Sequence, residues 1–227
     1  MSLDDMLSPN CISNAIKILS QDSKIVFSAN TGHYEIDEHG VRITPDLYSS
    51  AAIEKIEKPQ DLLDKEYETL GTFYIQGQVF RKSAIDAAGR FDDTMTGDDI
   101  VLRTRIFRHM IDHPELKFSI GTDIVFAYRK HTGNLHKRTF RQIRTIIEWK
   151  EKYFPDQPYP ELFYRWLEGF FSQCLKKGLD DELQFALKYS PIIHDHYIRY
   201  KRNWKFYRNS IKGLITRVTR TSVRKNI

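Results

Sequence analysis

Residues 77–105 read GQVFRKSAIDAAGRFDDTMTGDDIVLRTR, and this stretch decides how the rest of the chain is interpreted. Gly89 and Arg90 predict a chain reversal, and apolar side chains alternate with arginines at helical spacing after position 99. Asp98 and Asp99 therefore stand at the start of a predicted helix. Carboxylates there cap free N–H groups and interact favourably with the helix dipole. Alternatively, one caps the helix while the other faces a cleft as a general base, because a rigid element holds a base in place.

The composition predicts a folded protein. The chain has 227 residues, of which 41% are hydrophobic and 29% charged, enough for one large domain or a domain with an appendage. Its two cysteines, Cys11 and Cys174, lack CxxC spacing and indicate neither a disulfide scaffold nor a zinc site. We find no apolar run that could span a bilayer and no charged-then-apolar leader. We therefore expect a cytoplasmic protein, with peripheral contact to the inner face of the membrane left open.

The positive charge is concentrated in the C-terminal tail. The formal net charge is +5, and no acidic residue follows Asp195. Residues 197–227 carry apolar side chains at helical spacing, among them Trp204 and Ile211, surrounded by lysines and arginines. This pattern is typical of a basic amphipathic helix on an anionic membrane surface. A partner-binding helix and a solvated tail are the alternatives, and nucleic acid is disfavoured because no recognised binding motif accompanies the charge.

The order of features within 77–105 resembles that of a known enzyme family. Gly77 is followed by the basic pair 81–82, the turn sequence GRFD at 89–92, and the acidic pair Asp98 and Asp99. This order is similar to the second half of the catalytic domain in inverting, family-2-type glycosyltransferases with the GT-A fold. The resemblance implies a nucleotide-sugar donor, a saccharide or lipid-linked acceptor, and Asp99 as the catalytic base with Asp98 beside it.

Two positions depart from the family pattern. Arg90 replaces the second glycine of the turn, and Asp98 replaces the usual glutamate. Asp98 keeps the charge, and the turn position of Arg90 only sometimes needs a positive φ. We therefore expect both departures to be mild.

A second motif lies at the N-terminus. Asp4 and Asp5, followed by three residues and Pro9, resemble the family's metal-binding acidic motif, with Ser2 replacing its first aspartate. The resemblance implies that both carboxylates bind a divalent cation, Mg²⁺ or Mn²⁺, since these ions take hard oxygen ligands. Solvation of two acids near a terminus is the alternative. Ser8 is predicted to cap the helix that follows.

Four further residues are assigned by the same resemblance. Family members place substrate contacts near the glycine at 77 and the basic residue at 81, so Gly77 and Arg81 are candidate substrate-binding residues. The sequence around Arg129 and His131 is similar to the family's YRxHxxN loop over the donor diphosphate. Arg129 is therefore a candidate substrate-binding residue and His131 a candidate metal ligand. Surface arginines and a structural histidine are the alternatives.

The predicted fold class is α/β. The resemblance implies a partial GT-A mixed sheet that lacks its N-terminal nucleotide-binding half and is followed by a helical region. We place the acceptor-side half at 1–135, a helical extension at 136–195, and a basic amphipathic helix or tail at 196–227. Periodicity predicts strands at 25–30, 72–75, 116–120 and 124–128, a hairpin at 34–43 with exposed His33 and His39, and helices at 59–70, 99–111, 140–149, 162–175 and 180–189.

Two functions from different classes follow. The first is an inverting glycosyltransferase of polysaccharide biosynthesis, or a fragment of one, with Asp99 as general base. Because the family's nucleotide-binding units are missing, we expect little activity from this chain alone. The second is a non-catalytic basic module that docks on membrane or nucleic acid through its C-terminal helix.

Overall fold

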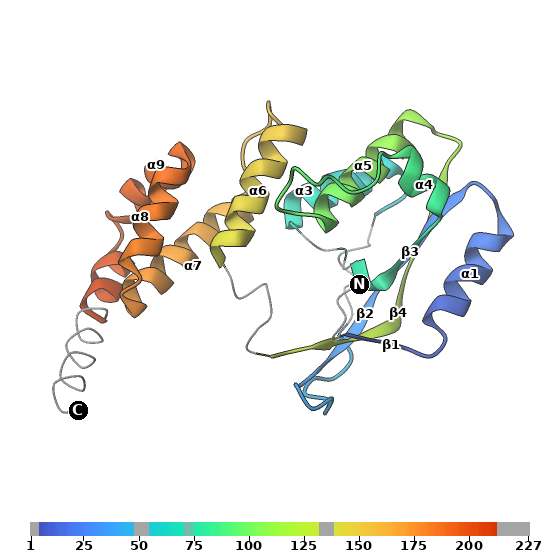
Figure 1. The fold of residues 1–227 in the computed structure, drawn as a ribbon, viewed down its shortest axis with the longest axis horizontal. Helices are drawn as coiled ribbons and strands as arrows, with labels where there is room; N and C mark the ends of the chain where they lie inside the picture. The colour runs from blue at the N-terminus through green and yellow to red at the C-terminus, as the bar shows by residue number, and fades with distance from the viewer. Residues whose placement is uncertain (1–4, 48–54, 71–72, 74, 132–138, 213–227) are drawn as a thin grey trace. The chain divides into compact units, whose positions relative to one another are not determined.

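The computed structural model describes residues 5–47, 55–70, 73, 75–131 and 139–212 (Figure 1). The chain divides into two compact units, and each is described by itself. The first contains residues 1–138 and 145–157, and the second contains residues 139–144 and 158–227. The boundary predicted at residue 135 lies outside the described residues.

The first unit is built on a four-stranded mixed sheet. Its strands are β1 (Met6–Leu7), β2 (Ile25–Ile36), β3 (Gln78–Phe80) and β4 (Lys117–Arg129), in the order β1-β4-β2-β3. The two long strands β2 and β4 are parallel, and each has a short antiparallel strand on its outer side. The sheet with its helices makes the described part of this unit α/β, as predicted.

The two long strands were each predicted as two shorter ones. Register shifts interrupt the pairing of β2 with β4 on both sides of Gly32, so the apolar alternation breaks there although the strand continues. A Cβ at Gly32 would lie 2.3 Å from the Thr122 carbonyl oxygen, and only glycine allows this approach. His33 therefore lies half-buried within β2, stacked on Phe126 at 5.0 Å between ring centroids, and the prediction of an exposed hairpin residue was wrong for it.

Helices cover both faces of this sheet. Figure 1 shows α3 (Pro59–Thr69) and α5 (Asp99–Asp112) on one side and α1 (Cys11–Gln21) on the other; α4 (Lys82–Ala87) precedes the loop to α5. The apolar face of α5 is fully buried, and Phe107 packs on Phe27 of β2 at 5.8 Å between ring centroids. Proline at the first position and an acidic first turn start α3, where Asp61 accepts hydrogen bonds from the backbone N–H groups of Glu57 and Lys58.

Two local predictions were wrong. Ser8 does not cap α1; its backbone N–H donates to Val125 and its hydroxyl to Ile124, so it extends the pairing of β1 with β4. The two described residues of the strand predicted at 72–75 are not in a strand: Phe73 lies in a bend, and Ile75 begins a 3₁₀ turn, Ile75–Gly77, that leads into β3. Residues 71, 72 and 74 lie outside the described residues.

The second unit is helical. The last described helices are α7 (Glu161–Lys177), α8 (Asp180–Tyr189), α9 (Pro191–Tyr200) and a helix at 204–212, while α6 (Thr139–Tyr153) contributes its first residues here and the remainder to the first unit. Gly178 ends α7 with φ +65°, as expected for a left-handed C-cap. Aromatic residues of α7 and α9 form the core, where Phe171 contacts Tyr197 and Tyr200.

The basic C-terminal helix begins later than predicted. Tyr197 belongs to α9, and a turn at 201–203 separates it from the helix at 204–212. The remainder of the predicted amphipathic segment, 213–227, lies outside the described residues. Among the helices that the structure describes, none combines the length and apolar character needed to cross a bilayer.

The turn before the acidic pair contains a strained residue. Gly89 has φ +86° and Arg90 has φ +60°, so Arg90 occupies the left-handed region that favours glycine. This position does require a positive φ, and the expectation of a mild departure was wrong for Arg90. Its side chain is exposed and pairs with Asp86, with 2.7 Å between Nε and Oδ1.

We expect Arg90→Gly to stabilise the protein. Relief of the left-handed conformation contributes about 1–2 kcal/mol, offset in part by the lost exposed ion pair and the greater freedom of glycine in the unfolded state. The free energy of unfolding in urea should rise by about 0.5–1 kcal/mol. Arg90→Ala is the control, because it removes the ion pair and keeps the strain; equal losses of stability in both variants would contradict this account.

Candidate functional site

The loop between α4 and α5 leads to the acidic pair Asp98 and Asp99, and Asp92 anchors it. This buried carboxylate accepts hydrogen bonds from Lys152 Nζ at 2.6 Å, Arg105 Nη2 at 3.0 Å and the Thr94 hydroxyl at 2.6 Å. The hydrogen bond from Lys152, followed by that from Thr94, holds the pKa of Asp92 well below its usual range. The start of the loop is therefore tied to both α5 and α6.

The middle of the same loop is held by α6. Glu148 accepts hydrogen bonds from the backbone N–H of Thr96 at 2.8 Å and from its hydroxyl at 3.1 Å. Next to it, a Cβ at Gly97 would lie 2.2 Å from the Thr145 Cγ2 atom, so this glycine allows the loop to pack against the helix. These contacts therefore fix the position of the loop directly before the two aspartates at the start of α5.

We expect Asp92→Asn to flatten the acid sensitivity of stability. Because the pKa of Asp92 is lower in the folded than in the unfolded state, its stabilisation is complete above the ordinary value near 3.9 and is lost as pH falls toward the folded-state pKa. Free energies of unfolding measured in urea at several pH values below about 5 should fall less steeply in the variant than in wild type. Asp93→Asn, at an exposed neighbour, is the control and should follow wild type. Parallel curves for Asp92→Asn and wild type would contradict the assignment.

Asp98 is the cap of α5. Its Oδ1 accepts a hydrogen bond from the Asp99 N–H at 2.9 Å, its carbonyl accepts the Leu102 N–H, and its side chain is exposed. Asp99 is the first residue of the helix and need not serve as the cap. The structural role expected for one of the two carboxylates is thus filled by Asp98.

The Asp99 carboxylate is half-buried and, among the described residues, accepts no hydrogen bond and forms no ion pair. Burial raises its pKa above the usual range, against the attraction of Arg103, and the negative charges of Asp98 and Glu66 add to the increase. A carboxylate with a raised pKa and unused acceptor oxygens can accept a proton from a bound hydroxyl.

A buried ion pair lies one helical turn beyond Asp99. Arg103 of α5 and Glu66 of α3 are joined by two hydrogen bonds, Nη2–Oε1 at 2.8 Å and Nε–Oε2 at 3.1 Å, with side chains 4% and 0% exposed. Although burial opposes its charge, the charge and hydrogen bonds of Glu66 raise the pKa of Arg103. The guanidinium is thereby held charged and fixed close to the candidate base. The spacing of Asp99 and Arg103, four residues apart on one helix, is the sequence signal for this arrangement.

Asp5 and Arg129 lie together at the end of the sheet. Asp5 is buried; its Oδ1 accepts the Arg129 backbone N–H at 2.9 Å and its Oδ2 accepts Gln76 Nε2 at 2.8 Å. The Arg129 guanidinium donates to the carbonyls of Asp37 and Glu38 at 3.0 and 2.9 Å, which closes the turn after β2. These bonds give both side chains a structural role. Gln76 was not among the predicted site residues, and no pattern in the amino-acid sequence indicates its contact with Asp5.

Gly77 and Arg81 also make structural contacts. A Cβ at Gly77 would lie 2.1 Å from the Asn30 carbonyl oxygen, so close packing on β2 explains the glycine. The Arg81 guanidinium donates to the carbonyls of Ile25, Leu19 and Asp22 and ties the end of α1 to the start of β2. Substrate binding by these two residues stays a prediction.

The cation site also stays a prediction. Asp4 lies outside the described residues, and His131 is half-buried at the end of the described segment after β4. Within the described residues, no three histidine, cysteine or acidic side chains are grouped as metal ligands. Asp5, whose two oxygens already accept hydrogen bonds, does not by itself form a divalent site, and we derive no reaction step through a cation.

The fold and site define an α/β protein with a half-buried aspartate at the start of a sheet-packed helix. Neither the family models nor the curated proteins compared with the sequence give a match to the chain.

Proposed function

We propose that this chain belongs to an inverting glycosyltransferase of GT-A type that transfers a sugar from a nucleotide-sugar donor to a saccharide or lipid-linked acceptor. The proposal combines the family resemblance of residues 77–105 with one structural observation. Asp99, the residue that the resemblance assigns as base, is a half-buried carboxylate with a raised pKa and no hydrogen bond or ion pair from the described residues.

In the proposed reaction, Asp99 removes the proton of the acceptor hydroxyl. The hydroxyl oxygen forms a bond to the anomeric carbon on the face opposite the leaving group, and the bond from that carbon to the diphosphate oxygen breaks with its electrons. The product sugar is therefore inverted, and the proton remains on Asp99 until solvent takes it. A raised pKa strengthens the base, while the nearby Arg103 charge favours the ionised form of the carboxylate and acts against the increase.

A transfer assay tests this proposal. Radiolabelled nucleotide sugars of several bases and hexoses are incubated with Mg²⁺ or Mn²⁺ and with soluble and lipid-linked saccharide acceptors. Both this chain and any longer product of the same reading frame are assayed. We expect inverted product and nucleoside diphosphate release from at least the longer product, with little from this chain alone. Release from neither form with any donor would contradict the proposal.

A second function is supported by the surface of the C-terminal helix. Trp204, Tyr207 and Ile211 are 62%, 61% and 59% exposed, and basic residues flank them. We therefore also propose peripheral contact with an anionic membrane through this helix. Because Tyr197, Tyr200 and Asn209 are buried within the helical unit, point variants test this contact better than removal of residues 197–227.

A further inference from the structure

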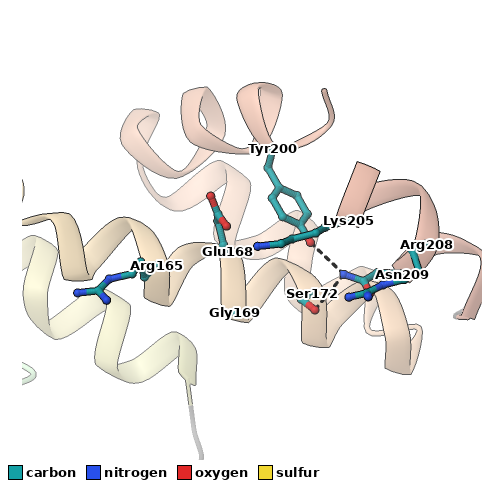
Figure 2. Close-up of a pocket in the computed structure, with 8 residues that line it drawn as sticks. All are labelled: Arg165, Glu168, Gly169, Ser172, Tyr200, Lys205, Arg208 and Asn209. Atoms are coloured by element: carbon teal, nitrogen blue, oxygen red, sulfur yellow. Dashed lines mark hydrogen bonds between the residues drawn. The ribbon is translucent and has the colours of Figure 1, made fainter. Parts of the chain in front are cut away.

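An open hollow of about 390 Å³ lies among α7, the end of α9 and the helix at 204–212 (Figure 2). Tyr200, Ser172 and Asn209 form a polar wall on one side of it. Asn209 is only 1% exposed, and its Nδ2 donates to the Ser172 hydroxyl and to the Tyr200 hydroxyl, both at 3.0 Å. These hydrogen bonds fix the orientation of the amide.

The other end of that amide is unused. The Oδ1 atom of Asn209 is buried and has no hydrogen-bond partner among the described residues. A buried acceptor without a partner costs about 1–3 kcal/mol, and a buried water bound to it would remove this cost. Because this oxygen is buried, a ligand in the hollow does not contact it directly.

The lining of the hollow is mainly cationic. It includes Lys205, Arg208 and Arg165 but a single acid, Glu168. Figure 2 shows the Arg165 guanidinium turned away from the other labelled side chains, which leaves Lys205 and Arg208 as the cations available to a ligand. The Oε1 atom of Glu168 lies 3.8 Å from Nε2 of His196. Burial lowers the pKa of His196, so the neutral form of this histidine is favoured. Two neighbouring cations suit a phosphate group.

An exposed apolar stripe lies beside this hollow on the same helix. At helical spacing, Trp204, Tyr207 and Ile211 occupy one face, and Lys205, Arg208 and Asn209 occupy the face next to it. Arg208 lies between the two, with its guanidinium carbon 4.5 Å from the centre of the Trp204 ring. Tryptophan and tyrosine beside basic residues are typical of side chains at a membrane interface. The stripe therefore favours a lipid, rather than a soluble compound, as the source of the phosphate.

We propose that the hollow binds the phosphate of an anionic phospholipid head group. Lys205 and Arg208 bind the phosphate, and Trp204, Tyr207 and Ile211 enter the interface. This inference rests on the membrane contact proposed above and assigns its head-group site to this hollow.

Vesicle binding by the full chain tests the proposal. We compare co-sedimentation with phosphatidylcholine vesicles and with vesicles in which about a third of the lipid is phosphatidylglycerol. The pocket variant Lys205→Gln/Arg208→Gln is compared with Lys201→Gln/Arg202→Gln, which removes the same charge from the turn before the helix. We expect binding of wild type to the anionic vesicles, a loss of about 30-fold for the pocket variant, and a loss of only a few-fold for the control.

The other outcomes separate the explanations. Equal losses in the two variants would show diffuse charge attraction and overturn the pocket while leaving the membrane contact. Absence of wild-type binding to anionic vesicles would overturn both. Full displacement from vesicles by millimolar glycerol phosphate, together with unchanged binding of Trp204→Ser/Tyr207→Ser, would show a soluble phosphate ester as ligand and overturn the lipid assignment. None of these readouts depends on sugar transfer, so their outcome does not affect the glycosyltransferase proposal.

Discussion

Asp99→Asn is expected to lower the rate of sugar transfer by about 10²–10⁴-fold in whichever form of the protein is active. The amide keeps the shape of the side chain but cannot take the acceptor proton. Stability should change by less than about 1 kcal/mol, because the carboxylate accepts no hydrogen bond from the described residues, and its attraction to the helix dipole and Arg103 is partly offset by repulsion from Asp98 and Glu66. Initial rates with saturating donor, together with unfolding curves in urea, measure both effects.

Asp98→Asn is the matched control for this variant. Asparagine caps a helix about as well as aspartate, so the cap is kept while one acidic charge is removed from the residue directly before the candidate base. We expect the transfer rate of Asp98→Asn to stay within a few-fold of wild type. Comparable rates for Asp99→Asn and Asp98→Asn would remove Asp99 from the role of base.

Glu66→Gln is expected to lower the free energy of unfolding by about 3 kcal/mol or more. The variant leaves Arg103 charged and 4% exposed in the core between α3 and α5, without the carboxylate that compensates its burial. It should also lower the pKa of Asp99, since a negative charge that raises it is removed. Urea unfolding at neutral pH measures the loss of stability.

Two further variants show whether the ion pair is the cause. Glu68→Gln, on the same helix but exposed, should leave stability within about 0.5 kcal/mol of wild type. The double variant Glu66→Leu/Arg103→Met should recover most of the loss, because replacing both charges with apolar side chains leaves no uncompensated charge. If the double variant is as unstable as Glu66→Gln, packing at this position and not charge is responsible.

Cap and breaker residues made several helix boundaries predictable from the sequence. Pro59 starts α3, Asp98 and Asp99 start α5, and Gly178 ends α7, each through backbone chemistry that is local to the residue. Local chemistry can also mislead. Ser8 has the side chain of an N-cap, but its donors are used by β4, more than one hundred residues later in the chain.

The buried ion pair could have been suspected. Glu66 falls four residues after Leu62 and three after Leu63, within the apolar face of the predicted helix. A charged side chain on a buried face requires a partner, so the position of Glu66 already implied one. Its identity could not be predicted, because Arg103 lies 37 residues later and on a different helix.

The anchoring roles of Arg81 and Arg129 were beyond sequence reasoning. Both were predicted to contact substrate, and both guanidinium groups donate to backbone carbonyls. The sequence does not show which backbone carbonyl accepts a hydrogen bond, since every residue has one. The sequence does indicate why the Asp99 carboxylate is not needed as the cap of α5, because a second acid, Asp98, stands before it at the helix start.

The account depends on Asp99 being a half-buried carboxylate to which no described residue donates a hydrogen bond, and its titration measures this most directly. Carbon-13 NMR of the aspartate side-chain carboxyls, assigned by the loss of one resonance in Asp99→Asn, follows the pKa of this group in the intact chain. We predict a midpoint above the ordinary value for an aspartate, because burial disfavours the charged form. A midpoint at or below that ordinary value would place the Asp99 carboxylate in solvent or in an ion pair and would contradict its role as the catalytic base.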